Sequence, residues 1–443
     1  MRSPPFALYP LAMSTSFVGT TRLTHEPVLT EGLHRTVPLR CHDAITTASR
    51  FAVALGMQMV AKSDMTTGNS VYASYVLRSN DLVFVFSAPY GGGNEDETAE
   101  EVEQKRSNIP HSAYDGESMI KFITKHGLAV KAVGVVVDDA RDAHRKSSAN
   151  GARHATYGAG DGTKPPAEGI SEVELYGDVV MRFVSESVAA NGAFCLPRYE
   201  LVPVEPAGSE PLCYGLRRLD HAVGNVHDLL ETVDYISNFT GMHEFAEFTA
   251  EDVGTVDSGL NSMVLANNSE YILLPVNEPT FGTKRKSQIQ TYLEQNKGPG
   301  LQHLALKTDN IFDTVRKMRA LGGFRGGFEF QKPASEGYYR DLPGRVGADA
   351  LSPDQFKEVE ELGLLVDKDD QGVLVQVFTK PLGDRPTVFI EIIQRIGCMR
   401  EVGGEEAEEK KLEQAAGCGG FGKGNFSELF KSIENFERTL KMA

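Results

Sequence analysis

The chain has 443 residues, 41% of them hydrophobic, which is enough for two to four domains with their own apolar cores. Asp and Glu number 61 against 45 Lys and Arg, and the resulting net charge of −16 argues against binding to nucleic acid or anionic lipid. No apolar run approaches the roughly 18 residues that a membrane span needs.

Two features bear on the compartment. The first 25 residues contain Ser, Thr, Arg2 and Arg22 but no acidic residue, which is typical of a transit peptide and equally of a disordered N-terminus. Five cysteines form neither a CxxC pair nor an even set for disulfides, which favours a reducing compartment. We expect a cytoplasmic protein, with the plastid as the alternative.

The N-terminal half is predicted to begin with a strand and a helix between residues 36 and 57. Adding 185 to each number matches this segment to 221–242 without a gap, with His-Asp before both helices and Gly-Met after them. A second strand at 133–136 matches 303–306 when 170 is added. The two halves of the chain therefore repeat one plan.

In the C-terminal half the pattern is clearer. Apolar runs that end in Gly, Asn or Lys predict strands, and apolar residues at helical spacing predict the helices that follow them. Gly241 and the pair Gly322-Gly323 end these helices. The predicted strands are 219–226, 260–266, 271–275, 301–307, 372–379 and 387–393, and the predicted helices are 227–239 and 310–321. Four βαβββ-like units result, two in each half.

Three residues of this half have the composition of a mononuclear iron site. His221 and His303 occupy matching strands of sister units, and Glu391 lies in the last strand of the second unit. Two imidazoles and one carboxylate leave metal positions open for a substrate and O₂, as in non-haem Fe(II) oxygenases. The matching positions of the N-terminal half, with strand 177–184 placed on 383–390, are Thr36, Val133 and Ser185. We therefore expect one half to carry the ligands and the other to lack them.

Plainer interpretations stay open. A single histidine in an apolar strand is more often a core or surface residue than a metal ligand. Glu391 lies within an apolar run, where an unpaired carboxylate costs several kcal/mol, so it needs either an ion or a charge partner. Arg395 is the candidate partner. The sequence alone does not decide between the two.

Amide and aromatic side chains surround the three candidate ligands in the sequence. Amides suit the binding of hydroxyl, carboxylate or keto oxygens, and phenylalanines suit an aromatic ring. Each one taken singly is more often an ordinary surface or core residue. The amides are Asn277, Gln288, Gln302, Gln376 and Asn425, and the phenylalanines are Phe378, Phe389, Phe421 and Phe426.

A glycine-rich stretch at 417–425 precedes an amphipathic helix predicted at 427–440. The stretch lacks the GxxxxGK[ST] order of a phosphate-binding loop, and no strand is predicted before it. We interpret it as a flexible hinge and the helix as a lid over the site.

Six stretches closely resemble the 4-hydroxyphenylpyruvate dioxygenase family, and the likeness runs from about residue 44 to the C-terminus and is greatest to the plant enzymes. They are RLDHAVGNV (218–226), FAEFTAEDVGT (245–255), GLNSMVLANN (259–268), GPGLQHLA (298–305), FIEIIQR (389–395) and GGFGKGNF (419–426). The resemblance implies one Fe(II) per chain on His221, His303 and Glu391. It implies that Ser262 and the amides and phenylalanines named above line the substrate pocket, and that the protein is a homodimer.

The implied fold class is α+β, with two vicinal-oxygen-chelate domains, each of paired βαβββ modules forming an open barrel-like sheet, plus a C-terminal helix. Four regions are expected. They are a non-homologous or disordered extension (1–32), a metal-free domain (33–205), a catalytic Fe(II) domain (206–400), and an acidic linker with hinge and gating helix (401–443). Residues 33–43 depart from the family's Phe-His-His-type strand, and Pro38 removes a ladder hydrogen bond there.

The implied reaction converts 4-hydroxyphenylpyruvate and O₂ to homogentisate and CO₂. Three alternatives stay open at this point. A hydroxymandelate synthase uses the same substrate and iron but hydroxylates the benzylic carbon. A glyoxalase-like isomerase of the same fold needs no O₂, and an inactive relative binds the oxo acid without consuming O₂.

Overall fold

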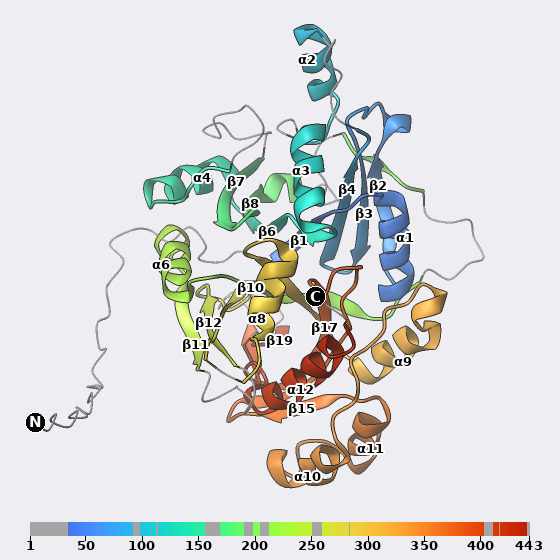
Figure 1. The fold of residues 1–443 in the computed structure, drawn as a ribbon, viewed down its shortest axis with the longest axis vertical. Helices are drawn as coiled ribbons and strands as arrows, with labels where there is room; N and C mark the ends of the chain where they lie inside the picture. Colours follow the sequence, from blue (N-terminus) through green and yellow to red (C-terminus); the bar gives the residue numbers. More distant parts are fainter. Residues whose placement is uncertain are drawn as a thin grey trace, which may run out of the picture.

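A computed structural model describes most of the chain. The described residues are 34–91, 98–111, 114–155, 169–189, 198–203, 212–249, 259–282, 284–402, 411–415 and 417–440. The extension predicted at 1–32 lies outside them, as does 403–410 of the acidic linker. Two large sheets, one in each half of the chain, make up the molecule (Figure 1). The division into four regions given above stays a prediction.

The first sheet has the strand order β7-β8-β6-β1-β4-β3-β2-β9, with β5 paired to β1. Its strands are β1 (His34–Arg40), β2 (Gln58–Ser63), β3 (Tyr72–Ser79), β4 (Leu82–Pro89), β5 (Ala129–Val130), β6 (Ala132–Val137), β7 (Ile170–Tyr176), β8 (Val179–Ser185) and β9 (Glu200–Leu201).

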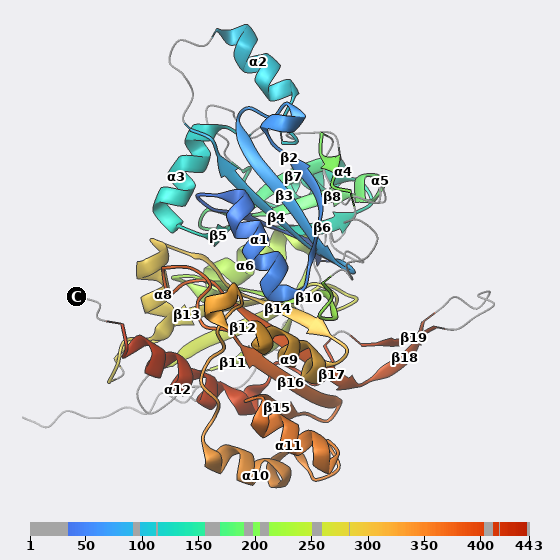
Figure 2. The same cartoon turned by 90° about the vertical axis from the view of Figure 1, so that its right-hand side faces the viewer.

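The second sheet has the order β11-β12-β13-β10-β14-β17-β16-β15. Its strands are β10 (Leu216–Asn225), β11 (His243–Phe248), β12 (Leu260–Ala266), β13 (Leu273–Pro279), β14 (Gly300–Thr308), β15 (Leu365–Lys368), β16 (Gly372–Phe378) and β17 (Phe389–Gly397). A separate hairpin of β18 (Met399–Val402) and β19 (Lys411–Gln414) projects from its end (Figure 2).

The two sheets share one plan, as the internal repeat predicts. In each, two central strands pair antiparallel, β1 with β6 and β10 with β14, and each central strand pairs parallel with the last strand of its own unit. The helix after each first strand is α1 (Ala44–Leu55) or α6 (Leu229–Thr240), and their first residues differ by the predicted 185. Both end at a left-handed glycine, Gly56 and Gly241, where a side chain would be strained.

The remaining helices include the other two repeat helices, α4 (Ala140–Ala149) and α9 (Ile311–Leu321). Within the described residues, α4 is followed by two strands of its unit rather than three. The insertions are α2 (Ala99–Ser107), α3 (Gly116–His126), α5 (Glu186–Ala189), α8 (Gln288–Asn296), α10 (Glu336–Val346) and α11 (Pro353–Glu361), and the chain closes with α12 (Phe426–Glu437). No helix in the part of the chain that the structure describes is both long and apolar enough to span a membrane.

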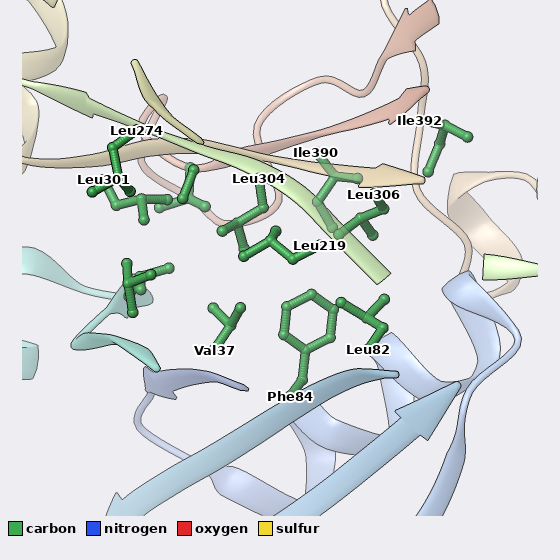
Figure 3. Close-up of a cluster of buried hydrophobic side chains, with 14 of the residues drawn as sticks. Val37, Leu82, Phe84, Leu219, Leu274, Leu301, Leu304, Leu306, Ile390 and Ile392 are labelled. Atoms are coloured by element: carbon green, nitrogen blue, oxygen red, sulfur yellow. The ribbon is translucent and has the colours of Figure 1, made fainter. Parts of the chain in front are cut away.

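The main core lies between the two sheets. Apolar side chains of β1 and β4 meet those of β10, β14 and β17, so the sheets pack face to face (Figure 3). Leu304 and Leu306 of β14 and Ile390 and Ile392 of β17 are fully buried there. Because side chains alternate along a strand, His303, which precedes Leu304, and Glu391, which lies between Ile390 and Ile392, face the other side of the sheet.

Two details of the first sheet differ from the prediction. Thr36 pairs with Gly134 and Gly134 with Arg182, as His221 pairs with Ala305 and Ala305 with Glu391, so Arg182 occupies the position equivalent to Glu391, and Ser185 does not. Equal residue counts do not fix strand register, which the backbone pairing sets. Pro38 does not prevent the first strand, because β1 pairs on both sides and the Pro38 carbonyl accepts a hydrogen bond from the Lys131 amide.

A disulfide corrects the prediction that the cysteines stay unpaired. Cys398, after β17, is bonded to Cys418 at the start of the segment that leads to α12. Gly372 leaves room for it, since a Cβ there would lie 2.4 Å from the Cys418 sulfur. An odd number of cysteines could not indicate this pair, because contact between β16, β17 and residues 417–420 creates it.

Removing the disulfide should destabilise the protein. Closing a loop of 20 residues restricts the unfolded chain, and a loop of this size contributes about 3 kcal/mol. The double variant Cys398→Ser/Cys418→Ser should therefore melt at a lower temperature than the oxidised wild type, and reduced wild type should match it. Cys213→Ser, which changes an exposed free cysteine, is the control. Equal melting of double variant and oxidised wild type would show that the bond is absent in solution.

Candidate metal centre

The three predicted ligands come together on the face of the second sheet that points away from the other sheet. His221 is on β10, His303 on β14 and Glu391 on β17, which are adjacent strands. The Nε2 atoms of His221 and His303 lie 3.2 and 3.5 Å from Glu391 Oε2. One ligand atom from each residue fits within 4.8 Å of the others, and among the described residues no other such group of His, Cys, Asp or Glu occurs.

An irregularity in the pairing of β10 with β14 turns both histidines to this face. Leu219 pairs with Leu306 and His221 with Ala305, so Asp220 is an extra residue. Val223 pairs with His303 and Gly224 with Leu301, so Gln302 is a second one. Each is a β-bulge, which re-aims the side chain that follows it. Without the first bulge, His221 would share a face with Leu219, which lies in the core between the sheets.

The two extra residues also hold the histidine rings. Asp220 Oδ1 lies 2.9 Å from His221 Nδ1, and Gln302 Oε1 lies 3.1 Å from His303 Nδ1. Each ring therefore has its Nδ1 engaged and its Nε2 directed at Glu391. This is the arrangement in which a second residue fixes the tautomer and orientation of a metal-binding imidazole.

Arg395 does not take the role of charge partner of Glu391 that the sequence left open. Its Nε and Nη2 donate to the two oxygens of Asp220 at 3.0 and 2.7 Å, and both side chains are buried. Burial opposes the ionisation of Asp220, but the charge of Arg395 outweighs it and holds the pKa of Asp220 well below its usual range. Glu391 faces the two histidines instead.

The electrostatics of the three side chains favour a cation between them. Burial opposes the charge on Glu391, but the charge of His221 and hydrogen bonds from both rings lower its pKa. Burial likewise opposes a proton on His221, yet Glu391 and the Asp220 hydrogen bond raise its pKa. Burial dominates at His303 and lowers its pKa. The buried carboxylate thus attracts positive charge to the space between the rings.

Two observations indicate that the site fits a metal ion: its donor set, and a carboxylate oxygen of Glu391 that has no hydrogen-bond partner among the described residues. Glu391 is 2% exposed, and its Oε1 has no hydrogen-bond partner among the described residues. A buried carboxylate oxygen without a partner is costly, and a bound cation removes that cost. Two neutral nitrogens and one oxygen on one side are the donor set of mononuclear Fe(II) sites.

A pocket with about 610 Å³ of empty space opens beside these ligands. All ten predicted substrate-binding residues line it together with the three ligands: Ser262, Asn277, Gln288, Gln302, Gln376, Phe378, Phe389, Phe421, Asn425 and Phe426. The Phe389 ring stacks on His303 at 4.8 Å between centroids, and the Phe378 ring lies edge-on to His303 at 6.0 Å. Phe421 packs against His221 at 5.4 Å.

Sequence reasoning missed part of the apolar lining. Leu260 and Val264 lie two residues before and after Ser262 on β12 and share its face. The alternation of side chains along a strand predicts that both lie on the same face as Ser262, so the sequence contained the signal for them. Val223, Phe248 and Pro275 line the pocket from other strands. Asp220 and Arg395 were missed because their role depends on the bulge and on a partner 175 residues away.

The last helix closes one side of the pocket. It begins at Phe426, close to the predicted 427, and Leu429, Phe430 and Ile433 of α12 face the cavity. Asn425, just before it, is fully buried, and its Oδ1 accepts hydrogen bonds from Tyr338 of α10 at 2.8 Å and from Arg345 at 3.2 Å. Its Nδ2 has no partner within the described residues. The insertion that carries α10 therefore leaves the amide N–H of Asn425 available to a ligand.

Paired βαβββ modules in curled sheets, with a His-His-Glu group inside one of them, define a protein of the vicinal-oxygen-chelate class. Solved structures agree on the fold. A triple mutant of 4-hydroxymandelate synthase from Streptomyces coelicolor superposes with a TM-score of 0.67 at 22% identity, covering 93% of this chain and all of that one. A xylose isomerase-like TIM barrel/4-hydroxyphenylpyruvate dioxygenase fusion protein gives 0.62 at 18% identity, covering 93% of this chain and 54% of the fusion.

Sequence comparison identifies the family. The chain is 54% identical to 4-hydroxyphenylpyruvate dioxygenase of Arabidopsis thaliana over 408 residues, covering 90% of this chain and 87% of the relative. The enzyme of Hordeum vulgare is 51% identical with 90% and 87% coverage, and that of Danio rerio is 33% identical with 86% and 84%. No protein-family model matches the chain. This chain belongs to the 4-hydroxyphenylpyruvate dioxygenase family.

Proposed function

We propose that this protein is a dioxygenase that converts 4-hydroxyphenylpyruvate and O₂ to homogentisate and CO₂. One observation supports this most directly. In a chain more than half identical to plant enzymes of that name, His221, His303 and Glu391 converge at a pocket lined by amides and phenylalanines. A glyoxalase-like isomerase and an inactive binding protein are less well supported, because the relatives at this identity are dioxygenases by name.

The metal in this proposal is one Fe(II) per chain, held by the three convergent residues. When bound, it supplies open coordination positions for an oxo acid and O₂ and the redox chemistry of the reaction. The chain's own part is to hold both imidazoles in a fixed orientation, with each Nε2 directed at Glu391. Asp220 and Gln302 do so by engaging Nδ1 of each ring.

Recognition of the substrate falls to the other pocket residues. Phe378 and Phe426 would hold the aromatic ring between apolar faces. Amides bind oxygen without adding charge near the metal, so they suit the phenol and the 2-oxo acid group. Asn425 has a free N–H for this purpose, and Gln288 has a side-chain oxygen without a partner in the described part of the chain. The residues of this set are Ser262, Asn277, Gln288, Gln302, Gln376 and Asn425.

The helix α12 would act as a lid that excludes water during the reaction. Its apolar face lines the cavity, and it follows a segment rich in glycine. Those glycines also serve close packing, since a Cβ on Gly419 would lie 3.1 Å from the backbone of Val373. Water exclusion protects reactive species from side reactions.

The decisive experiment measures reaction products. Protein loaded anaerobically with Fe(II) is mixed with 4-hydroxyphenylpyruvate and O₂, and O₂ uptake, CO₂ release and the aromatic product are followed. We expect one homogentisate and one CO₂ to form for each O₂ consumed. 4-Hydroxymandelate as product would assign the protein to hydroxymandelate synthase chemistry instead. Binding of substrate without O₂ uptake would show an inactive relative or an isomerase.

Assembly and compartment belong to the same proposal. We infer a homodimer, as the family resemblance implies, which analytical ultracentrifugation of the purified protein tests directly. We infer the cytoplasm as its location, with the plastid as the alternative that the acid-free first 25 residues support. Imaging of a C-terminal fluorescent fusion distinguishes the two.

A further inference from the structure

We propose that Arg395 and Asp220 are positioning residues that couple the orientation of His221 to closure of the C-terminal segment over the pocket. The C-terminal segment here means residues 417–425, which precede α12. The inference rests on the proposed iron site and goes beyond it, because it concerns how a ligand and a lid influence each other.

The first contact in this coupling is between Arg395 and the ligand side of the site. Arg395 lies four residues after Glu391 on the same face of β17 and is 3% exposed. Two of its nitrogens donate to Asp220, whose Oδ1 also lies 2.9 Å from His221 Nδ1. A guanidinium that donates to both carboxylate oxygens fixes the plane of the carboxylate, and the carboxylate in turn fixes the orientation of the imidazole.

The second contact is between Arg395 and the C-terminal segment. The remaining nitrogen, Nη1, donates to the carbonyl oxygens of Cys418 and Gly420, each at 2.6 Å. The guanidinium carbon lies 5.6 Å from the centre of the Phe421 ring, which packs against His221 at 5.4 Å. Arg395 therefore reaches His221 by two routes, through Asp220 and through the chain that carries Phe421.

A lysine cannot replace this set of contacts. Its ammonium is a single point that cannot donate to two carboxylate oxygens and two carbonyls at fixed angles. If the segment moves away, Arg395 loses two acceptors and Phe421 leaves the ring of His221. By the reciprocity of linked equilibria, a metal that fixes His221 must then favour the closed segment to the same extent.

The test compares Arg395→Lys with wild type by two measurements that need no turnover. Fe(II) affinity is measured anaerobically by competition with a chelator, and amide hydrogen exchange of residues 417–425 is measured with and without Fe(II). We expect Fe(II) loading to slow exchange in this segment in the wild type. Arg395→Lys should bind Fe(II) about 10–100-fold more weakly and should lose the effect of Fe(II) on exchange.

Asp220→Asn is the second variant. It keeps an oxygen acceptor for His221 but removes the charge that holds Arg395, so we expect a smaller loss of affinity and the same loss of coupling. The matched control is Arg182→Lys in the first sheet, where Arg182 forms a similarly buried pair with Glu172 at 2.5 Å. The control should lower thermal stability while Fe(II) affinity and exchange in 417–425 stay at wild-type values.

The possible outcomes separate this inference from the proposed function. Wild-type Fe(II) affinity and Fe(II)-dependent exchange in Arg395→Lys would overturn the coupling even in an active dioxygenase. Equal changes in Arg395→Lys and Arg182→Lys would overturn it too, since they would reflect general destabilisation. If Fe(II) slows exchange in the wild type but not in Arg395→Lys, and the wild type forms no homogentisate, the coupling would be supported and the proposed reaction rejected.

Discussion

Replacing Glu391 with alanine is expected to strip iron from the protein and to abolish turnover. The carboxylate is the one anionic member of the ligand set, and its Oε2 lies within 3.5 Å of both histidine Nε2 atoms. Without it, two neutral imidazoles in a buried cavity must hold a divalent cation with no compensating charge. We expect Fe(II) affinity to fall by at least about 100-fold, since changes to residues that only support a ligand already cost 10–100-fold.

Iron content after gel filtration and O₂ uptake with 4-hydroxyphenylpyruvate measure this effect. Glu172→Gln is a suitable control, because Glu172 is an equally buried glutamate in the other sheet, 2% exposed, and lies outside the pocket. The control should keep its iron and lose only stability. Near-normal iron content together with activity in Glu391→Ala would reject the assignment of this residue as a ligand. His221→Ala and His303→Ala are expected to behave like Glu391→Ala.

Replacing Phe426 with alanine is expected to weaken substrate binding and to uncouple the reaction. Phe426 begins α12, and its ring packs against Phe248 at 5.4 Å and Phe430 at 6.0 Å while it lines the pocket. Truncation removes one wall for the substrate ring and loosens the start of the lid. We expect the Michaelis constant to rise about tenfold, which corresponds to about 1.4 kcal/mol of lost binding.

Uncoupling of the reaction means that CO₂ is released without formation of homogentisate, and it is measured by the ratio of homogentisate formed to CO₂ released. We expect this ratio to fall below one in Phe426→Ala, because water reaches the site before the aromatic product is complete. Phe436→Ala is the matched control, since Phe436 is a half-buried phenylalanine of the same helix that does not line this pocket. An unchanged Michaelis constant and an unchanged ratio in Phe426→Ala would exclude the lid role.

Much of the fold could be predicted because each unit has a recognisable local sequence pattern. Short apolar runs followed by helical spacing and a stop glycine recur at matching distances, so α1 and α6 begin 185 residues apart as predicted. The strands β12, β14 and β16 lie within two residues of their predicted positions. Register was less predictable, because pairing rather than residue count places Arg182 at the position equivalent to Glu391.

The sequence by itself determined the repeated plan, the chemical types of the three candidate ligands and ten of the residues that line the pocket with them. Only the tertiary structure decided how His221 and His303 face that pocket, because the extra residues Asp220 and Gln302 arise from the pairing of β10 with β14. It also decided that Arg395 contacts Asp220 and the segment before α12. These contacts join residues far apart in the chain, and local periodicity carries no information about them.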